Sequence, residues 1–153
     1  MAGTAAQPTS PQEPQSSATV ADVVRPALST VEPNAHLAAA AYLMKHAHAT
    51  CLVVVDDQHA NRPVGLITEA DVVHAVADGK DVNDVRIEDV MTTSPTVIPL
   101  TTTVRDAARS MIASHIHHLP VVDDTGLVGM VDIGGICSAL LGPPAVESSP
   151  PSG

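Results

Sequence analysis

A threonine and an aspartate lie three residues apart in the segment GLITEAD at residues 65–71, which begins with a glycine. The carboxylate of Asp71 can accept two hydrogen bonds from a cis-diol, and the hydroxyl of Thr68 can donate or accept at the same group. Gly65 has no side chain and would let a ligand approach the backbone. These residues therefore form a candidate site for a sugar-like diol.

The same spacing is also expected where a helix simply begins. Thr68 is a suitable N-cap residue and Asp71 a suitable residue of the first turn, so the pair is close to a capping box that needs no ligand. A second example of the segment in the same chain helps to separate the two interpretations.

That second example exists because the chain contains an internal repeat. The segment TVADVV at residues 19–24 aligns with RIEDVM at 86–91, and the alignment continues without a gap through Asp57 at an offset of 67 residues. Beyond a polar turn the offset becomes 64, which places GLITEAD opposite GMVDIGG at 129–135. We call the two copies motif one and motif two.

Motif two keeps a residue that can cap the helix but has no carboxylate at the position of Asp71. Asp132 stands in place of Thr68 and can cap a helix, whereas Gly135 stands in place of Asp71 and is a poor helix residue. Capping and diol recognition are therefore separable. The comparison predicts one competent site on motif one and one degenerate site on motif two.

Apolar periodicity defines the elements that must position these groups. Each motif has apolar residues at i, i+3, i+4 and i+7, which predicts a helix with one buried face. These residues are Leu37, Ala40, Ala41 and Met44 in motif one and Val104, Ala107, Ala108 and Met111 in motif two. Thr103, with Asp106 three residues later, predicts an N-cap.

Short apolar runs follow each helix and predict paired strands. The runs are residues 52–55 and 64–67 in motif one, and 119–122 and 127–131 in motif two. A second helix then ends at Asp78 and Gly79 in motif one, and at Gly142 and Pro143 in motif two.

Each motif is thus predicted to be an entering strand followed by helix, strand, strand and helix (β-α-β-β-α). A unit of about 60 residues leaves an apolar sheet face uncovered, so the two should pack sheet to sheet as one α/β module with a cleft between them. The predicted boundaries are a disordered tail at 1–18, motif one at 19–79, a linker at 80–85, motif two at 86–142 and a second tail at 143–153.

The charge and composition exclude several partners. With 17 acidic and 7 basic residues the net charge is −10, which disfavours nucleic acid and anionic membranes. No apolar run could span a bilayer and no signal peptide is recognisable, so the expected compartment is the cytoplasm. Cys51 and Cys137 are expected to be free thiols. Because Phe and Trp are absent, a planar ligand must lie on aliphatic side chains.

Motif two resembles the cystathionine-β-synthase (CBS) domain family through DVMTTSPTVIPLTTTVRDAARSMIASHIHHLPVVDDTGLVGMV, and motif one resembles it through GLITEADVV. The resemblance covers nearly the whole chain between the tails, although Val53 replaces the strand proline in motif one. A tandem pair of this kind is often called a Bateman module. The resemblance implies a sensor without enzymatic activity that binds adenosine-containing ligands in the cleft and transmits occupancy to another protein.

The family pattern also implies roles for particular residues. Gly65, Thr68 and Asp71 match the segment that contacts ribose, and His117 and His118 occupy positions where relatives often have phosphate-binding basic residues. A neutral imidazole donates one hydrogen bond, but full charge compensation needs protonation near about pH 6.5. Of the candidate ligands AMP, ADP, ATP and S-adenosylmethionine, ATP is therefore the least favoured. Alternatively, both histidines are half-buried structural residues at the strand entrance.

The histidines also suggest a metal site as an alternative. His115 and His117 would share one face of an extended segment, and His48 aligns with His115, so the three could converge in one cleft. Isolated histidines are more often solvated or packed, and no acidic residue lies at ligand spacing nearby. The sequence therefore predicts no bound metal and no required cofactor.

The leading functional prediction is a regulatory module that binds an adenosine-containing ligand, mainly through motif one, and signals to an unknown effector protein. The alternative is a ligand-independent dimerisation scaffold whose cleft has decayed. The chain has no G-x-S-x-G, Walker or H-E-x-x-H motif, so no enzyme is predicted. The resemblance further implies a homodimer formed through the helices, which the Ala-rich segment AHLAAAAYLM would allow.

Overall fold

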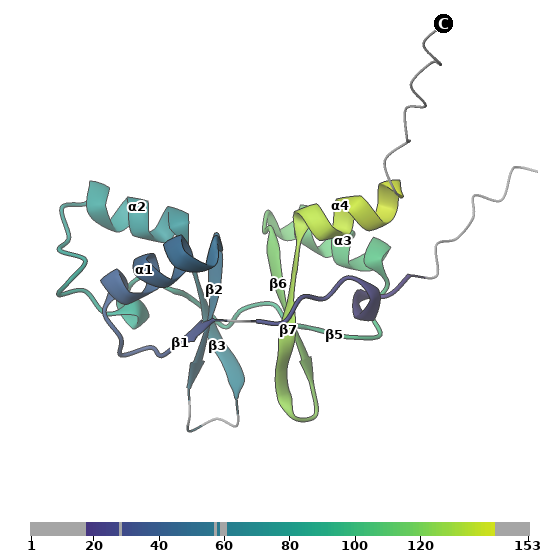
Figure 1. The fold of residues 1–153 in the computed structure, drawn as a ribbon, viewed down its shortest axis with the longest axis horizontal. Helices are drawn as coiled ribbons and strands as arrows, with labels where there is room; N and C mark the ends of the chain where they lie inside the picture. Colours follow the sequence, from purple (N-terminus) through teal and green to yellow (C-terminus); the bar gives the residue numbers. More distant parts are fainter. Residues whose placement is uncertain (1–17, 28, 57, 59–60, 143–153) are drawn as a thin grey trace, which may run out of the picture.

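The computed structural model describes residues 18–27, 29–56, 58 and 61–142. Apart from Ala18, the two predicted tails lie outside these residues. The described chain forms two lobes, each with a sheet and a pair of helices, and the helices of both lobes lie on the same side of the molecule (Figure 1). The predicted two-motif α/β fold is confirmed.

The first lobe carries the elements of motif one. Its strands are β1 (Thr30–Val31), β2 (Cys51–Asp56), β3 (Arg62–Thr68) and β4 (Thr92–Thr93), in that order across the sheet, and its helices are α1 (Leu37–Ala47) and α2 (Glu69–Ala77). Strand β1 runs parallel to β2, and β2 and β3 form an antiparallel hairpin. The predicted helices and paired strands of motif one are confirmed.

The second lobe repeats this arrangement with one strand fewer. Its strands are β5 (Ile98–Pro99), β6 (His118–Asp123) and β7 (Gly126–Asp132), and its helices are α3 (Val104–Ser114) and α4 (Ile133–Leu141). The hydroxyl of Thr103 accepts a hydrogen bond from the Asp106 amide at 3.1 Å, which confirms the predicted cap of α3.

The segment that leads into each motif packs on the other lobe. Val20, in the short helical turn η1 (Val20–Asp22), is fully buried against α3 and the second sheet. Ile87, in the equivalent turn η3 (Ile87–Asp89), is fully buried in the core of the first lobe. Figure 1 shows the N-terminal segment beside the second lobe before it crosses to β1. Each lobe is therefore completed by residues that precede the other motif.

Only one of the two exchanged segments forms a strand. Strand β4 pairs with β3 through two residues, Thr92 and Thr93. The equivalent residues near the N-terminus are Arg25 and Pro26, and only Arg25 pairs, with Met130. Arg25 makes both backbone hydrogen bonds of this pair, at 3.0 and 2.9 Å, and Pro26 extends no ladder beyond it.

The two sheets meet through an apolar interface. Cys51, Val53, Val55 and Leu66 of the first sheet form a buried cluster that packs against Leu127 and Met130 of the second. Leu66 and Met130 occupy equivalent positions in the repeat, so the interface follows the pseudo-two-fold symmetry. This packing confirms the sheet-to-sheet prediction and leaves a cleft beside it. In the described ranges, every helix is too short or too polar to cross a membrane.

Candidate functional site

Two cavities in the cleft share Thr50 and His118 in their walls. The Thr50 Oγ1 and His118 Nε2 atoms are hydrogen-bonded at 3.1 Å. The cavity that contains Thr68, which we call the motif-one pocket, has a volume of about 510 Å³. The cavity that contains Asp132, the motif-two pocket, measures about 400 Å³. Both volumes lie in the range of small-molecule sites.

The motif-one pocket combines residues from both motifs. Thr68 and Glu69, at the start of α2, and Thr92, on β4, form one side, and His117 and His118 lie on the other. The structure thus brings three predicted site residues, Thr68, His117 and His118, to one cavity. The other two, Gly65 and Asp71, do not line it. No residue of its described lining is a lysine or arginine, and Glu69 adds a negative charge.

Asp71 lies directly behind Thr68 and is bonded to it. Its Oδ2 atom accepts hydrogen bonds from the Thr68 amide at 2.8 Å and the Thr68 hydroxyl at 2.9 Å, while the Asp71 amide donates to Thr68 Oγ1 at 3.3 Å. The capping box is therefore present. No hydrogen bond from the described chain reaches Asp71 Oδ1. One carboxylate oxygen caps the helix, and the other retains its capacity to accept.

Gly65 is required by packing of the chain itself. A Cβ atom at this position would lie 2.5 Å from Met91 Sδ and 2.9 Å from the carbonyl oxygen of Thr92. The exchanged segment before motif two crosses the first sheet here, and only glycine leaves enough space for it. Gly129 has the same role in the second sheet, where a Cβ atom would overlap the carbonyl oxygen of Arg25.

His118 is half-buried and poorly suited to be a cation. Burial lowers the pKa of its imidazole below the ordinary value of 6.5, an effect opposed by the charge of Asp132 and reinforced by His117. At neutral pH it is therefore uncharged and offers hydrogen bonds only. His117 is exposed at the edge of the motif-one pocket.

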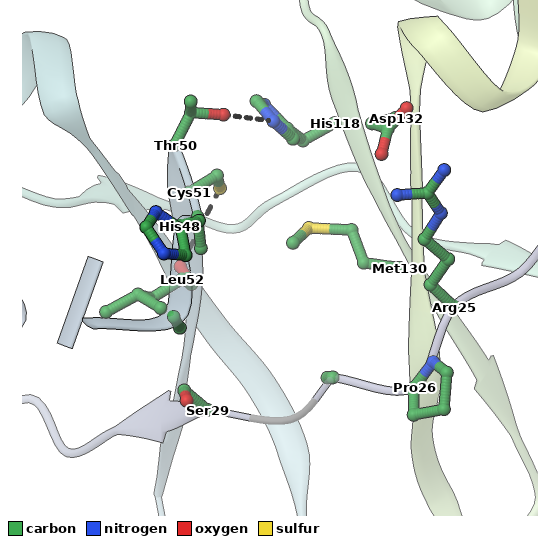
Figure 2. Close-up of a pocket in the computed structure, with 13 residues that line it drawn as sticks. Arg25, Pro26, Ser29, His48, Thr50, Cys51, Leu52, His118, Met130 and Asp132 are labelled. Atoms are coloured by element: carbon green, nitrogen blue, oxygen red, sulfur yellow. Dashed lines mark hydrogen bonds between the residues drawn. The ribbon is translucent and has the colours of Figure 1, made fainter. Parts of the chain in front are cut away.

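The motif-two pocket has different chemistry at equivalent positions (Figure 2). The repeat offsets place Arg25 opposite Thr92, Met130 opposite Leu66 and Asp132 opposite Thr68. Asp132 caps α4, since its Oδ1 atom accepts from the Gly135 amide at 2.7 Å, as the sequence predicted. Arg25 was not predicted from the sequence as a site residue, because the offset of 67 relates it only to Thr92, which was not predicted as a site residue either.

The metal alternative is not supported by the geometry. His48 and His115 end α1 and α3 in the left-handed conformation, with φ of 52° and 53°. His48 lines the motif-two pocket, whereas His115 and His117 line the motif-one pocket, so the three do not converge. In the part of the chain that the structure describes, no three histidine, cysteine or acidic residues are grouped to hold a metal ion.

The cysteines have no activated thiol in the cleft. Cys51 and Cys137 are both free, and Cys137 is exposed on α4. Burial, with a smaller contribution from the charge of Asp71, raises the pKa of the Cys51 thiol to about 12. Since the thiolate is the nucleophile, Cys51 is inert at neutral pH. Cys51 begins β2 opposite Thr68, the residue to which the Asp71 carboxylate is bonded.

The repeat, the exchanged segments and the paired pockets agree with comparison to known proteins. The CBS domain family matches the chain twice, over residues 20–78 and 87–142. The chain belongs to the CBS domain family, and its two motifs form a Bateman module.

Relatives and solved structures extend this result. An uncharacterized 17.7 kDa protein of Acidianus ambivalens is 37% identical over 123 residues, which cover 80% of this chain and 73% of that protein. The crystal structure of CBSX2, a protein of Arabidopsis thaliana, in complex with AMP has a TM-score of 0.67 and 29% identity, covering 81% of this chain and 96% of that one.

A second structure holds other adenosine compounds. The CBS domain pair of protein MJ0100 in complex with 5′-methylthioadenosine and S-adenosylmethionine has a TM-score of 0.69 and 26% identity, with coverage of 80% and 94%. For several other curated relatives the matched region is less than two thirds of their own length.

Proposed function

We propose that this chain is a regulatory module that binds an adenosine-containing ligand in the motif-one pocket and signals occupancy to a partner protein. The observation that carries the proposal is a cavity of about 510 Å³ with Thr68 in its wall and Asp71 bonded behind it. Similar CBS pairs bind AMP, or S-adenosylmethionine and 5′-methylthioadenosine, which supports the same ligand class here.

The ribose is the part of the ligand that the site fits best. The ribose hydroxyls would donate to Asp71 Oδ1 and to the lone pair left on Thr68 Oγ1, so the capping box and the ligand use different acceptor positions. Gly65 contributes indirectly, because it holds β4 and Thr92 at the edge of the pocket.

The rest of the pocket selects among adenosine compounds. The adenine would lie against Leu66, Ala70 and Ile116, the aliphatic side chains of the lining. His117 and His118 would donate single hydrogen bonds, while Glu69 would repel a phosphate chain. The pocket therefore favours S-adenosylmethionine or AMP over ADP, and ADP over ATP.

A matched pair of variants tests this site. Thr68 with Asp71 and Thr103 with Asp106 are similar pairs, each an N-cap threonine bonded to the carboxylate three residues later, and Asp106 lines neither pocket. Asp71→Ala and Asp106→Ala each remove that carboxylate but leave the threonine cap, so each should destabilise the fold by about 1 kcal/mol or less. Only Asp71→Ala should abolish binding.

The measurement is a dye-based thermal shift, because the chain has no tryptophan. With AMP or S-adenosylmethionine at about 100 times its dissociation constant, wild type and Asp106→Ala should gain roughly 2.7 kcal/mol. If no adenosine compound stabilises the wild type, the alternative of a ligand-independent scaffold is correct. If Asp71→Ala binds the ligand as tightly as wild type, the ligand binds at a different place.

We also propose that the module acts as a homodimer that presents its helices to a second copy. Several large apolar side chains are exposed on the helices: Tyr42, Val73, Val76, Ile112 and Leu141. The four helices lie on one side of the molecule, where a second copy could cover them (Figure 1). Sedimentation equilibrium measures the mass directly, and the mass of one chain would refute the dimer.

A further inference from the structure

The motif-two pocket contains two opposite charges that the protein does not pair. Figure 2 shows the guanidinium group of Arg25 extending toward Asp132, with both residues on the second-lobe side of the cavity. The Arg25 side chain forms no hydrogen bond or ion pair with any described residue. A guanidinium group next to a carboxylate but not bonded to it leaves room for a ligand group between them.

Hydrogen bonds hold the backbone of Arg25 and the carboxylate of Asp132. The Arg25 amide donates to the Met130 carbonyl at 3.0 Å, and the Met130 amide donates to the Arg25 carbonyl at 2.9 Å. The Asp132 carboxylate is oriented by the Gly135 amide, which binds Oδ1 at 2.7 Å, and no described hydrogen bond reaches Oδ2. The two groups therefore lie close together on the same side of the cavity, each with capacity to bind a ligand.

A phosphorylated nucleoside does not fit these charges. Gly135 provides no carboxylate where motif one has Asp71, so the diol contact is missing. Asp132 stands where motif one has the hydroxyl of Thr68, and its charge would repel a phosphate. His118 cannot compensate, because burial lowers its pKa and leaves it neutral.

The remaining wall of the cavity is largely apolar. Leu52, Met130 and Ala49 line it, together with the small residues Ala27 and Ala47. With a volume of about 400 Å³, the pocket can hold a small molecule that carries one positive group, one negative group and an aliphatic portion.

We propose that the motif-two pocket binds an α-amino acid with an apolar side chain. Arg25 binds the carboxylate through two parallel N–H donors, and Asp132 Oδ2 accepts from the ammonium group. The side chain of the ligand packs against Met130, Leu52 and Ala49. This site is separate from the adenosine site and does not depend on it, although both pockets have Thr50 and His118 in their walls.

Titration calorimetry of the full chain with L-leucine and L-methionine tests the proposal. The controls lack one charged group each: the decarboxylated amines 3-methylbutylamine and 3-(methylthio)propylamine, and the deaminated acids 4-methylpentanoate and 4-(methylthio)butanoate. One equivalent of leucine or methionine should bind, and each analogue should bind at least about tenfold more weakly.

Two variants assign the charges to their partners. Arg25→Gln removes the cation, and Asp132→Asn removes the anion but keeps an N-cap acceptor for the Gly135 amide, so α4 remains capped. Each should weaken amino-acid binding at least about tenfold. Arg25→Gln should bind the amines as tightly as wild type does, because the amines lack the carboxylate that Arg25 would bind. Asp132→Asn should likewise bind the acids as tightly as wild type, because the acids lack the ammonium group.

The control variants separate this site from the motif-one pocket. Arg105→Gln, on the exposed face of α3, and Asp71→Ala should leave amino-acid binding unchanged. Thermal midpoints confirm that each variant is folded. The proposal is overturned if neither amino acid binds, if the analogues bind as tightly as the amino acids, or if AMP binding depends on Arg25 while amino-acid binding does not.

Discussion

The two pockets are built from equivalent backbone elements but carry different functional groups. In the motif-one pocket the equivalent positions hold the hydroxyls of Thr68 and Thr92, whereas in the motif-two pocket they hold the charges of Asp132 and Arg25. The helix start that carries each pocket is capped in both motifs. Because the cap preserves the fold, the residues around it could change without loss of the helix.

This difference shows which residues of a duplicated unit are constrained. Gly65 and Gly129 occur in both copies because a neighbouring backbone occupies the space of a side chain. Asp71 occurs in one copy only, and Gly135 in the other keeps the same helix. These packing positions are therefore shared between the copies, while the pocket positions of Thr68 and Thr92 differ from those of Asp132 and Arg25.

The largest expected effect is on stability at the two glycine crossings. Gly129→Ala should destabilise the fold by about 3 kcal/mol, since the new Cβ overlaps the backbone of Arg25. Gly65→Ala should cost less, because one of its two near neighbours is the movable Sδ of Met91. Urea unfolding measures both.

Gly135→Ala is the control for the glycine variants. Its nearest contact, to Asp132 Oδ1, is an ordinary 3.6 Å, and the position is inside a helix, so the variant should be neutral or stabilising by up to about 1 kcal/mol. If Gly129→Ala has the same unfolding free energy as wild type, the packing explanation is wrong.

A transplant sharpens the comparison at the level of binding. The triple variant Arg25→Thr, Asp132→Thr and Gly135→Asp gives motif two the pattern of motif one. If these residues decide the chemistry, the variant should bind two equivalents of AMP or S-adenosylmethionine where the wild type binds one, with the second affinity within about tenfold of the first. Calorimetric stoichiometry measures the result.

The single variant Asp132→Thr is the control for the transplant, because it restores the hydroxyl without the carboxylate. It should still bind one equivalent. A triple variant that folds and also binds only one equivalent would show that other differences between the pockets exclude the nucleoside.

The smallest expected effect concerns His118, which lies between the pockets. Its pKa is lowered in the folded protein, so as the pH falls below about 6.5 the unfolded chain takes up the proton more readily. Stability should therefore be constant above this pH and decrease below it. His118→Gln should show a smaller decrease in thermal midpoint between about pH 7 and pH 5.

The exposed neighbour provides the comparison, since His117→Gln should leave most of the pH dependence in place. If the thermal midpoints of wild type and His118→Gln change identically with pH, burial of the His118 imidazole does not contribute to the pH dependence of stability. Asp132, which opposes the shift, is present in all three proteins.

Most local structure was predictable from the sequence because it follows from local rules. Apolar spacing identified α1 and α3, short apolar runs identified both hairpins, and Thr103 and Asp132 were recognised as caps. The repeat also predicted that two motifs would pack through their sheets.

The exchange of the entering segments was not predictable in this way. An internal repeat shows that Val20 and Ile87 are equivalent, but the same apolar residue can be buried in either copy. Which lobe it joins depends on long-range backbone contacts, such as those between Arg25 and Met130. For the same reason Arg25 was missed as a pocket residue.

The exchanged segments also set an order for synthesis of the chain. Residues 18–25 leave the ribosome before α3 and β7, on which they pack; Arg25 precedes its partner Met130 by about a hundred residues. The first lobe, in turn, lacks Ile87 and β4 until synthesis has passed Thr93. Neither lobe can reach its final state from its own motif alone: the first is completed only after β4 has been made, and the second only after β7 has been made and has met the segment before motif one.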